Sequence, residues 1–205
     1  NTMAFDALLG VALRSRGHNV YFTLCDGALT ACMYCELNKF KGLEEYKSRK
    51  AQKLCHDCSK TGQHILNIAG FKPLLLKPDG RRSSESWDLE IADSGTKRFL
   101  AKGRIDDQEE YKSVFEEYLK SSQIVNGEAR EIFSKNQFDL MIAHHGIYVP
   151  QGNMVAVAKE YEVPVITWVQ GYRKQSFLLG IGDTYHKSLL TESYEVDDLS
   201  PDEKK

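Results

Sequence analysis

Four cysteines constrain the fold of this chain more than any other feature of its sequence. Cys32 and Cys35 form one C-x2-C pair, Cys55 and Cys58 form a second, and 19 residues separate the two pairs. Each pair places two sulfurs on one side of a turn, and two such turns can enclose a metal ion with Zn–S distances of about 2.3 Å. Because four thiolates leave no open coordination position, the pattern predicts a structural zinc ion.

Other uses of these cysteines stay open. An iron–sulfur cluster takes the same four ligands and is the less favoured alternative, and the remaining possibilities are thiols without metal or two disulfides. All five cysteines fall within residues 25–58. The odd number and the lack of a signal-peptide pattern favour a reducing setting. Cys25 ends a predicted strand and is interpreted as a small buried hydrophobic residue rather than a fifth ligand.

Charge and hydropathy narrow the choice of partners. The net charge is −2, and residues 36–60 hold seven Lys and Arg against four acids, which is a small excess. We therefore expect no nucleic-acid partner. No apolar run approaches the roughly 20 residues that cross a bilayer, so the sequence predicts no transmembrane segment. The expected location is cytoplasmic, with the inner face of the membrane as the alternative.

The order of predicted elements indicates an α/β fold. Apolar spacing predicts a helix over 3–16 and a strand over 19–25. Further along, we predict helix at 36–54 and 59–69, irregular chain with short extended pieces at 71–106, and a long helix at 107–135 that can break near 126–127. A helix-first entry into an α/β pattern suggests that a preceding strand is missing, so the chain is interpreted as a fragment of a longer protein.

The second half of the chain predicts a βαβ unit. Residues 138–143 form a short apolar run suited to a buried parallel strand, a helix follows at about 152–161, and a second buried strand follows at 163–169. The predicted fold is a Rossmann-like, three-layer α/β domain with a parallel sheet. It spans residues 1–195, with a four-cysteine metal-binding helical insertion at about 26–60. Residues 196–205 are interpreted as an acidic tail or linker.

Ligands of parallel α/β sheets bind outside the carboxyl ends of the strands. Three segments fit that position: 144–152, 170–173 and 26–27. Glycines in the first segment allow close backbone approach, and the helix that follows it favours an anionic or hydroxyl-rich ligand. The candidate ligand-contacting residues are His144, Gly146, Tyr148, Gly152, Tyr172, Arg173, Asp183 and His186.

Simpler roles compete with binding at several of these positions. One of the two adjacent histidines can cap its strand while the other faces the cleft. Capping the start of a helix would by itself explain Asp183. His186 can lie on the surface. The chain lacks the common phosphate-loop, dinucleotide, serine-hydrolase and zinc-protease motifs, so those enzyme signatures are absent.

Four segments together resemble a known family. They are CDGALTACMYC at 25–35, CHDC at 55–58, AHHGIYVPQGNMVAVAKEYEVPVITWVQGYRKQSF at 143–177 and GDTYHKSLL at 182–190. These segments resemble the amino-terminal half of bacterial capsule or surface-polysaccharide biosynthesis proteins. That family is glycosyltransferase-like, with two Rossmann-like domains in the GT-B arrangement. The resemblance covers roughly residues 3–195 and is strongest at 138–190.

The resemblance implies a role for the whole chain. In GT-B transferases the amino-terminal domain mainly holds the acceptor, and the carboxyl-terminal domain binds most of the nucleotide-sugar donor. The chain would then be the acceptor-side part of a glycosyltransferase, inactive without its donor domain, with a saccharide acceptor as partner. His145 is the first choice for the general base that takes the proton of the acceptor hydroxyl, and Asp26 is the second. GT-B transferases generally need no catalytic divalent metal, which agrees with a structural role for the cysteines.

Two alternatives remain open at this level. One is a zinc-containing interaction module that binds protein or nucleic acid without catalysis. The other is a stand-alone Rossmann-like binder of sugars or nucleotides. The transferase hypothesis predicts that the loops at 144–152 and 170–173 line one cleft.

Overall fold

The structure is a computed structural model that describes residues 2–27, 29–35, 40, 43–48, 50–77, 82–103, 108–184 and 187. The helices are α1 (Thr2–Arg14), α2 (Leu43–Lys47), α3 (Lys50–Ile68), α4 (Ser86–Leu100), α5 (Gln108–Lys135) and α6 (Gln151–Glu160). The strands are β1 (Thr23–Cys25), β2 (Leu74–Leu76), β3 (Met141–His144), β4 (Val165–Gln170) and β5 (Phe177–Ile181).

The described strands form two small sheets in a mixed α/β fold. β1 and β2 pair in parallel, and β3 and β4 also pair in parallel with α6 between them in sequence. The predicted βαβ unit is therefore confirmed. β5 then folds back and pairs with β4 in the antiparallel direction. The described sheets are thus parallel and mixed, rather than a single parallel sheet.

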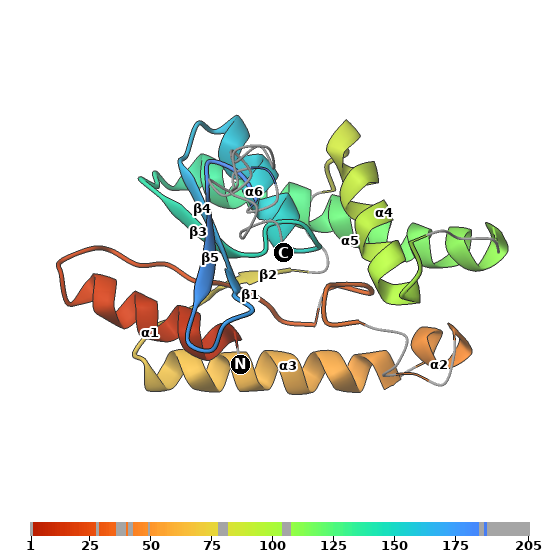
Figure 1. The fold of residues 1–205 in the computed structure, drawn as a ribbon, viewed down its shortest axis with the longest axis horizontal. Helices are drawn as coiled ribbons and strands as arrows, with labels where there is room; N and C mark the ends of the chain where they lie inside the picture. Colours follow the sequence, from red (N-terminus) through yellow and green to blue (C-terminus); the bar gives the residue numbers. More distant parts are fainter. Residues whose placement is uncertain are drawn as a thin grey trace, which may run out of the picture.

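Two hydrophobic clusters hold these elements together. The larger cluster lies among α4, α5 and α6 and includes the fully buried side chains of Phe99, Tyr118 and Val125. The smaller one joins α1 and α3 to β1, with Leu24 and Leu66 buried between them. Figure 1 shows α3 along the lower edge of the molecule with α1 beside one end of it, while α4 and α5 lie on the right and α6 at the top.

The segment at 71–106 is more regular than predicted. Strand β2 agrees with the short extended pieces predicted there, but the 15-residue helix α4 contradicts the prediction of irregular chain. The glycine, serine and threonine residues of α4 hide its apolar spacing, in which Ile91, Ala92, Phe99 and Leu100 are buried. A capping box between Glu85 and Asp88 starts the helix, because each side chain accepts the other residue's backbone N–H.

Other predicted boundaries shift or disappear. Helix α5 runs without a break through Asn126 and Gly127, both of which are buried. The strand predicted at 19–25 is shorter at its start, and β5 was not predicted at all. Part of the helix predicted at 36–54, at 36–39, 41–42 and 49, lies outside the described residues. Among the described helices, none is both long and apolar enough to cross a membrane.

Candidate functional site

A cavity of about 230 Å³ lies at the carboxyl ends of the parallel strands β3 and β4. This is the end of an α/β sheet where ligands generally bind. The first turns of α1 form one wall, and the loop between β4 and β5 forms another. The residues lining the cavity are Thr2, Phe5, His144, Trp168, Gln170, Gln175, Ser176 and Phe177.

Aromatic rings and uncharged polar groups dominate the lining. Phe5 stacks on Phe177 with ring centroids 4.4 Å apart, and it lies 4.4 Å from Trp168. The other lining side chains are hydroxyls, amides and one imidazole, and none of the eight residues is an Asp, Glu, Lys or Arg. Apolar surface combined with a few hydroxyl and amide groups suits a small neutral ligand that carries hydroxyl groups.

His144 is the predicted site residue that the structure places in this cavity. It is 8% exposed, and its ring lies 4.7 Å from that of Trp168. Burial, followed by the nearby His145 and Arg98, lowers the pKa of His144 to about 4, so the imidazole is neutral at physiological pH. Its Nδ1 is buried without a hydrogen-bond partner among the described residues.

His145 lies directly behind His144, and it does not line the cavity. Its backbone is left-handed, with φ of +59°, and its N–H donates to the carbonyl of Trp168 over 2.9 Å. The two imidazole rings are 4.2 Å apart. The next residue, Gly146, is also left-handed, and a Cβ there would lie 2.7 Å from the methyl group of Thr167. Only glycine therefore fits at this position.

Two other predicted contacts in the same loop have packing roles. The guanidinium of Arg98 lies 5.2 Å from the ring centroid of Tyr148, in a cation–π arrangement. A Cβ at Gly152 would lie 2.6 Å from the carbonyl oxygen of Ile147, so a glycine is needed for the loop to turn into α6. Neither residue lines the cavity.

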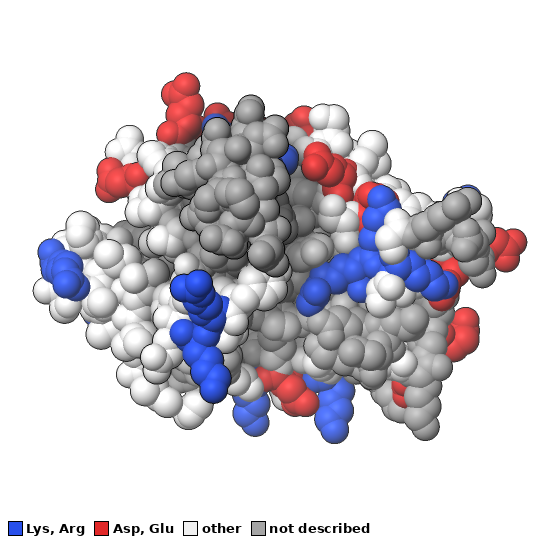
Figure 2. Space-filling view, viewed as in Figure 1, with Lys and Arg blue, Asp and Glu red and all other residues white. Residues whose placement is uncertain are grey.

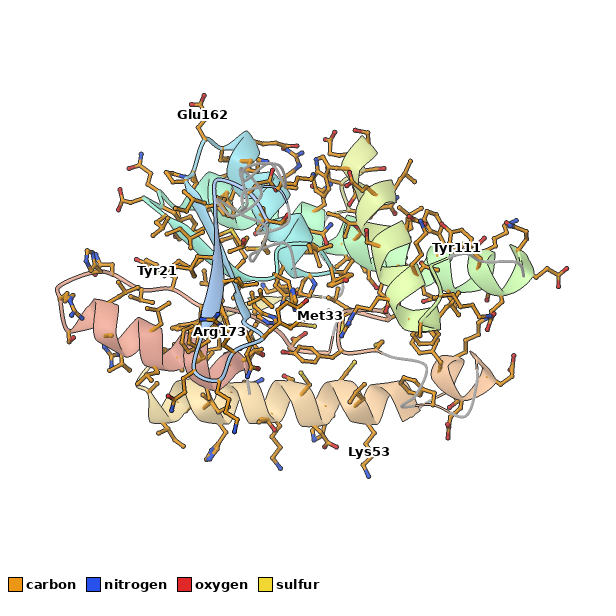
Figure 3. All side chains as sticks on the ribbon, in the orientation of Figure 1. Tyr21, Met33, Lys53, Tyr111, Glu162 and Arg173 are labelled. Atoms are coloured by element: carbon orange, nitrogen blue, oxygen red, sulfur yellow. The ribbon has the colours of Figure 1, made fainter. Side chains whose placement is uncertain are left out.

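The remaining predicted contacts are dispersed. Tyr172 is fully exposed and Arg173 is also exposed at the tip of the β4–β5 loop. Figure 3 shows Arg173 above the amino end of α1, and Figure 2 shows a largely uncharged surface around that loop, with basic side chains projecting from it. Asp26 is exposed after β1. His186 lies outside the described residues.

Asp183 does not line the cavity, and its N-cap role stays a prediction because no helix is described after β5. Its Oδ1 accepts the N–H of Thr184 over 2.7 Å, and its Oδ2 pairs with Lys159 over 2.6 Å. Burial alone would raise the pKa of Asp183, but these two partners hold it below its usual value. The carboxylate therefore stabilises the turn and tethers it to α6.

The cysteines of the two C-x2-C pairs lie near one another. The Sγ atoms of Cys32 and Cys35 are 4.0 Å apart, close to the separation of about 3.8 Å that a tetrahedral zinc site imposes. Cys55 and Cys58 lie one turn apart on α3. Burial and then the nearby Cys32, Cys25 and Cys58 thiols raise the pKa of Cys55 to about 11.

This gathering is looser than a finished metal site. Among the described residues, no three His, Cys, Asp or Glu side chains converge on a position that holds a metal ion. No disulfide joins any of the five cysteines, all of which are described. The thiol types and the Cys32–Cys35 separation fit zinc, but among the described residues the sulfurs of the two pairs do not converge on one position.

The turn between Cys32 and Cys35 contacts the loop that follows His145 and the first turn of α1. The N–H of Met33 donates to the carbonyl of Val149 over 2.9 Å. The hydroxyls of Tyr34 and Thr2 are 2.5 Å apart, and Thr2 lines the cavity. Figure 3 shows Met33 in the interior, between α3 and the elements above it. The cysteine turn thus packs between the histidine loop and the start of α1.

Comparison with protein-family models, with curated proteins and with solved structures found no match to this chain. The site therefore has to be interpreted from its own geometry and chemistry.

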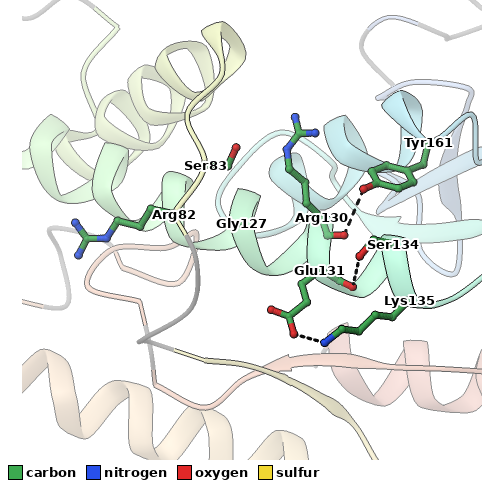
Figure 4. Close-up of a pocket in the computed structure, with 8 residues that line it drawn as sticks. All are labelled: Arg82, Ser83, Gly127, Arg130, Glu131, Ser134, Lys135 and Tyr161. Atoms are coloured by element: carbon green, nitrogen blue, oxygen red, sulfur yellow. Dashed lines mark hydrogen bonds and ion pairs between the residues drawn. The ribbon is translucent and has the colours of Figure 1, made fainter.

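A second, larger cavity of about 390 Å³ lies at the opposite end of β4 (Figure 4). Its lining includes Arg130 and Lys135 from α5, and Tyr161 just before β4. Both cations are already neutralised, because Arg130 pairs with Glu85 and Glu160 and Lys135 pairs with Glu131. With two of its three lining cations paired and its position at the amino end of the strand, this cavity is the weaker candidate for a ligand site.

Sequence reasoning missed most of the cavity lining. It identified His144 but not the aromatic residues Phe5, Trp168 and Phe177. One signal was available for Trp168, since a large aromatic residue near the carboxyl end of a predicted strand lies where ligands bind. No signal in the sequence showed that the first turn of α1 would pack against a strand more than 150 residues later.

Proposed function

We propose that residues 1–195 form the acceptor-side domain of a GT-B glycosyltransferase in bacterial cell-surface or capsular polysaccharide biosynthesis. In this proposal the domain is Rossmann-like with three layers, and a carboxyl-terminal domain beyond this chain binds the nucleotide-sugar donor. The resemblance of the segments at 25–35, 143–177 and 182–190 to that family supports the assignment.

The observation that carries the proposal is the cavity at the carboxyl ends of β3 and β4. Its aromatic surfaces can pack against the apolar face of a sugar ring, while amides and hydroxyls can bond to the sugar hydroxyls. Its neutral lining and its volume of about 230 Å³ favour one sugar unit over a charged nucleotide.

Catalysis in this proposal uses groups beside the cavity. His145 acts as the general base for the acceptor hydroxyl, and Asp26 is the second choice. The neutral His144 contacts the acceptor and lies 4.2 Å from the His145 ring, ring centroid to ring centroid. Of these two imidazoles, His144 orients the acceptor hydroxyl and His145 accepts its proton.

Binding of simple glycosides tests the proposal. We expect at least one of methyl β-D-glucoside, methyl β-D-galactoside and N-acetylglucosamine to bind the 205-residue chain, measured by saturation-transfer NMR. His144→Ala and Phe177→Ala should weaken that binding by about tenfold or more, since each removes a contact in the cavity. UDP-glucose should bind weakly, because the donor site lies in the other domain.

A matched control separates the two cavities. Arg82→Ala, in the cavity at the opposite end of β4, should leave glycoside binding unchanged. The proposal is wrong if none of the three glycosides binds, or if binding survives both cavity variants. Tight binding of UDP-glucose would instead favour a stand-alone nucleotide-sugar binder.

A zinc-containing interaction module is the second candidate function. The observation that favours it is the gathering of Cys32, Cys35 and Cys55. The hydrogen bond with Cys32, followed by burial, raises the pKa of Cys35, and burial, followed by the Cys32 thiol, raises the pKa of Cys55. In the transferase proposal the same cysteines hold a structural zinc ion, with an iron–sulfur cluster as the alternative. The two functions differ in whether the cavity beside His144 binds a saccharide.

A further inference from the structure

Beside the cavity, a hydrogen bond joins helix α1 to strand β4. The indole Nε1–H of Trp168 donates to Oδ1 of Asp6 over 2.9 Å, and the two residues are 162 positions apart in sequence. Trp168 is only 4% exposed. Asp6 is therefore the group that satisfies a buried donor, which would otherwise lose a hydrogen bond on folding.

Trp168 is the central ring of the cavity. It pairs with His144 across β3 and β4, and their ring centroids are 4.7 Å apart. Its ring also contacts Phe5 at 4.4 Å and Phe177 at 5.7 Å. The orientation of this one indole therefore sets where the histidine and both phenylalanine rings can lie.

The surroundings of Asp6 make the hydrogen bond sensitive to pH. Burial raises the pKa of Asp6 to about 6, and the hydrogen bond from Trp168 partly offsets that rise. The titratable group that faces it from a neighbouring element is Tyr34 on the cysteine turn. Arg14, on the same helix, instead binds the carbonyls of Ala69 and Gly70.

We propose that Asp6 is a positioning residue for the cavity, which acts by holding the indole of Trp168 in the orientation that places His144, Phe5 and Phe177 around the ligand. The ligand part of this inference rests on the proposed function, whereas the link between Asp6 and Trp168 does not. An ionised Asp6 holds the indole more strongly than a protonated one, because hydrogen bonds to charged groups are the stronger ones.

The indole N–H signal tests the link directly. In the ¹⁵N NMR spectrum of the 205-residue chain, the Trp168 signal should shift with an inflection near pH 6. Asp6→Asn keeps an oxygen acceptor in place, so it should remove the inflection and keep the indole protected from hydrogen exchange. Asp6→Leu should speed that exchange by about tenfold or more, because the acceptor is lost.

The protein carries its own control for this measurement. Its other tryptophan, Trp87, donates its indole N–H to Glu160 over 3.0 Å on a different part of the surface. The Trp87 signal should be the same in the Asp6 variants and the unmodified chain. If the Trp168 inflection survives Asp6→Asn, the proposed link is wrong.

Glycoside binding tests the consequence for the cavity. With the glycoside that binds most tightly, Asp6→Leu should weaken binding by about tenfold, and Asp6→Asn should restore most of it. Asp93→Asn is the control and should have no effect, because this α4 aspartate pairs with Lys97 of the same helix and with Tyr111 of α5. Because His144 has a pKa of about 4, its titration falls in a separate pH range.

The outcomes separate the two proposals. If Asp6→Leu binds glycoside as well as the unmodified chain while His144→Ala does not, the positioning role is overturned and the acceptor site stands. If no glycoside binds but the indole signal behaves as expected, the acceptor site fails and the link between Asp6 and Trp168 stands. Should Asp6→Leu fail to fold, the pH titration of the unmodified chain and of Asp6→Asn still decides the link.

Discussion

Asp88 shows how far a single side chain can organise this fold. Its carboxylate is fully buried among α4, α5 and α6. Oδ1 accepts hydrogen bonds from Ser122 at 2.5 Å and Asn153 at 3.2 Å, and Oδ2 accepts from Asn126 at 2.9 Å. The backbone N–H of Glu85 completes the set at 2.8 Å. A buried charge is tolerated here because hydrogen-bond donors surround it.

Removing that carboxylate should be among the most damaging single changes in the chain. We expect Asp88→Ala to lower the free energy of unfolding by about 3 kcal/mol or more, because three buried side-chain donors lose an acceptor. Urea unfolding followed by circular dichroism measures the change. Asp139→Asn, at an exposed position before β3, is the control and should stay within about 0.5 kcal/mol. A loss below about 1 kcal/mol for Asp88→Ala would mean that water replaces the carboxylate.

At the scale of elements, the contact between α4 and α5 depends on one glycine. A Cβ at Gly95 would lie 2.4 Å from Cδ1 of Tyr118. Tyr118 is fully buried, and its hydroxyl donates to the carbonyl of Cys32 over 3.1 Å. The ring cannot move away without disturbing the cysteine turn. Glycine thus brings α4 close enough to α5 for the tyrosine to reach that turn.

This contact predicts a reversal of the usual helix preference. Gly→Ala inside a helix normally stabilises by about 1 kcal/mol, but Gly95→Ala should destabilise by about 1–3 kcal/mol because of overpacking. Thermal unfolding measures the difference, and Ser94→Ala on the same helix should show the ordinary small gain. In a Tyr118→Ala background the clash is gone, so Gly95→Ala should become neutral or stabilising. Destabilisation that persists in that background would contradict the packing argument.

The elements also show where sequence reasoning succeeds. The βαβ unit of β3, α6 and β4 was predictable because both strands are short apolar runs with a helix between them. Helix α4 was not predicted, since Asp88, Gly95 and Thr96 interrupt its apolar stripe. Each of these three is buried for a reason that only the packed neighbours supply. The antiparallel β5 was missed because it is a five-residue apolar run interrupted by Gly180, which periodicity alone does not assign to a strand.

The candidate site, like the fold, was predictable only in part. The carboxyl-end rule located His144, because the rule depends only on strand order. The rule could not supply Thr2, Phe5 or Asp6, since their place beside β4 depends on how α1 packs against the smaller cluster around Leu66. The local sequence therefore predicts only part of the site, and the rest depends on tertiary packing between distant segments.

For the whole molecule, the cysteine pairs predict a bound metal ion, and its identity can be measured. We expect the purified chain to be colourless and to contain about one zinc ion, with chelation lowering the melting temperature by about 5 °C or more. Cys55→Ser and Cys58→Ser should abolish zinc binding, and Cys25→Ser should not. Elemental analysis and thiol titration measure these outcomes. A brown protein would favour an iron–sulfur cluster, and a metal-free one would rule out both.

The cavity beside His144 also sets when in its synthesis this protein can bind a ligand. Its walls come from Thr2 and Phe5 at one end of the chain and from residues 168–177 near the other. A nascent chain that has emerged only as far as α6 has the first wall without the second. Binding competence therefore arises only after residues 168–177 have been synthesised, and a ligand can stabilise the folded domain but cannot guide the folding of the residues before them.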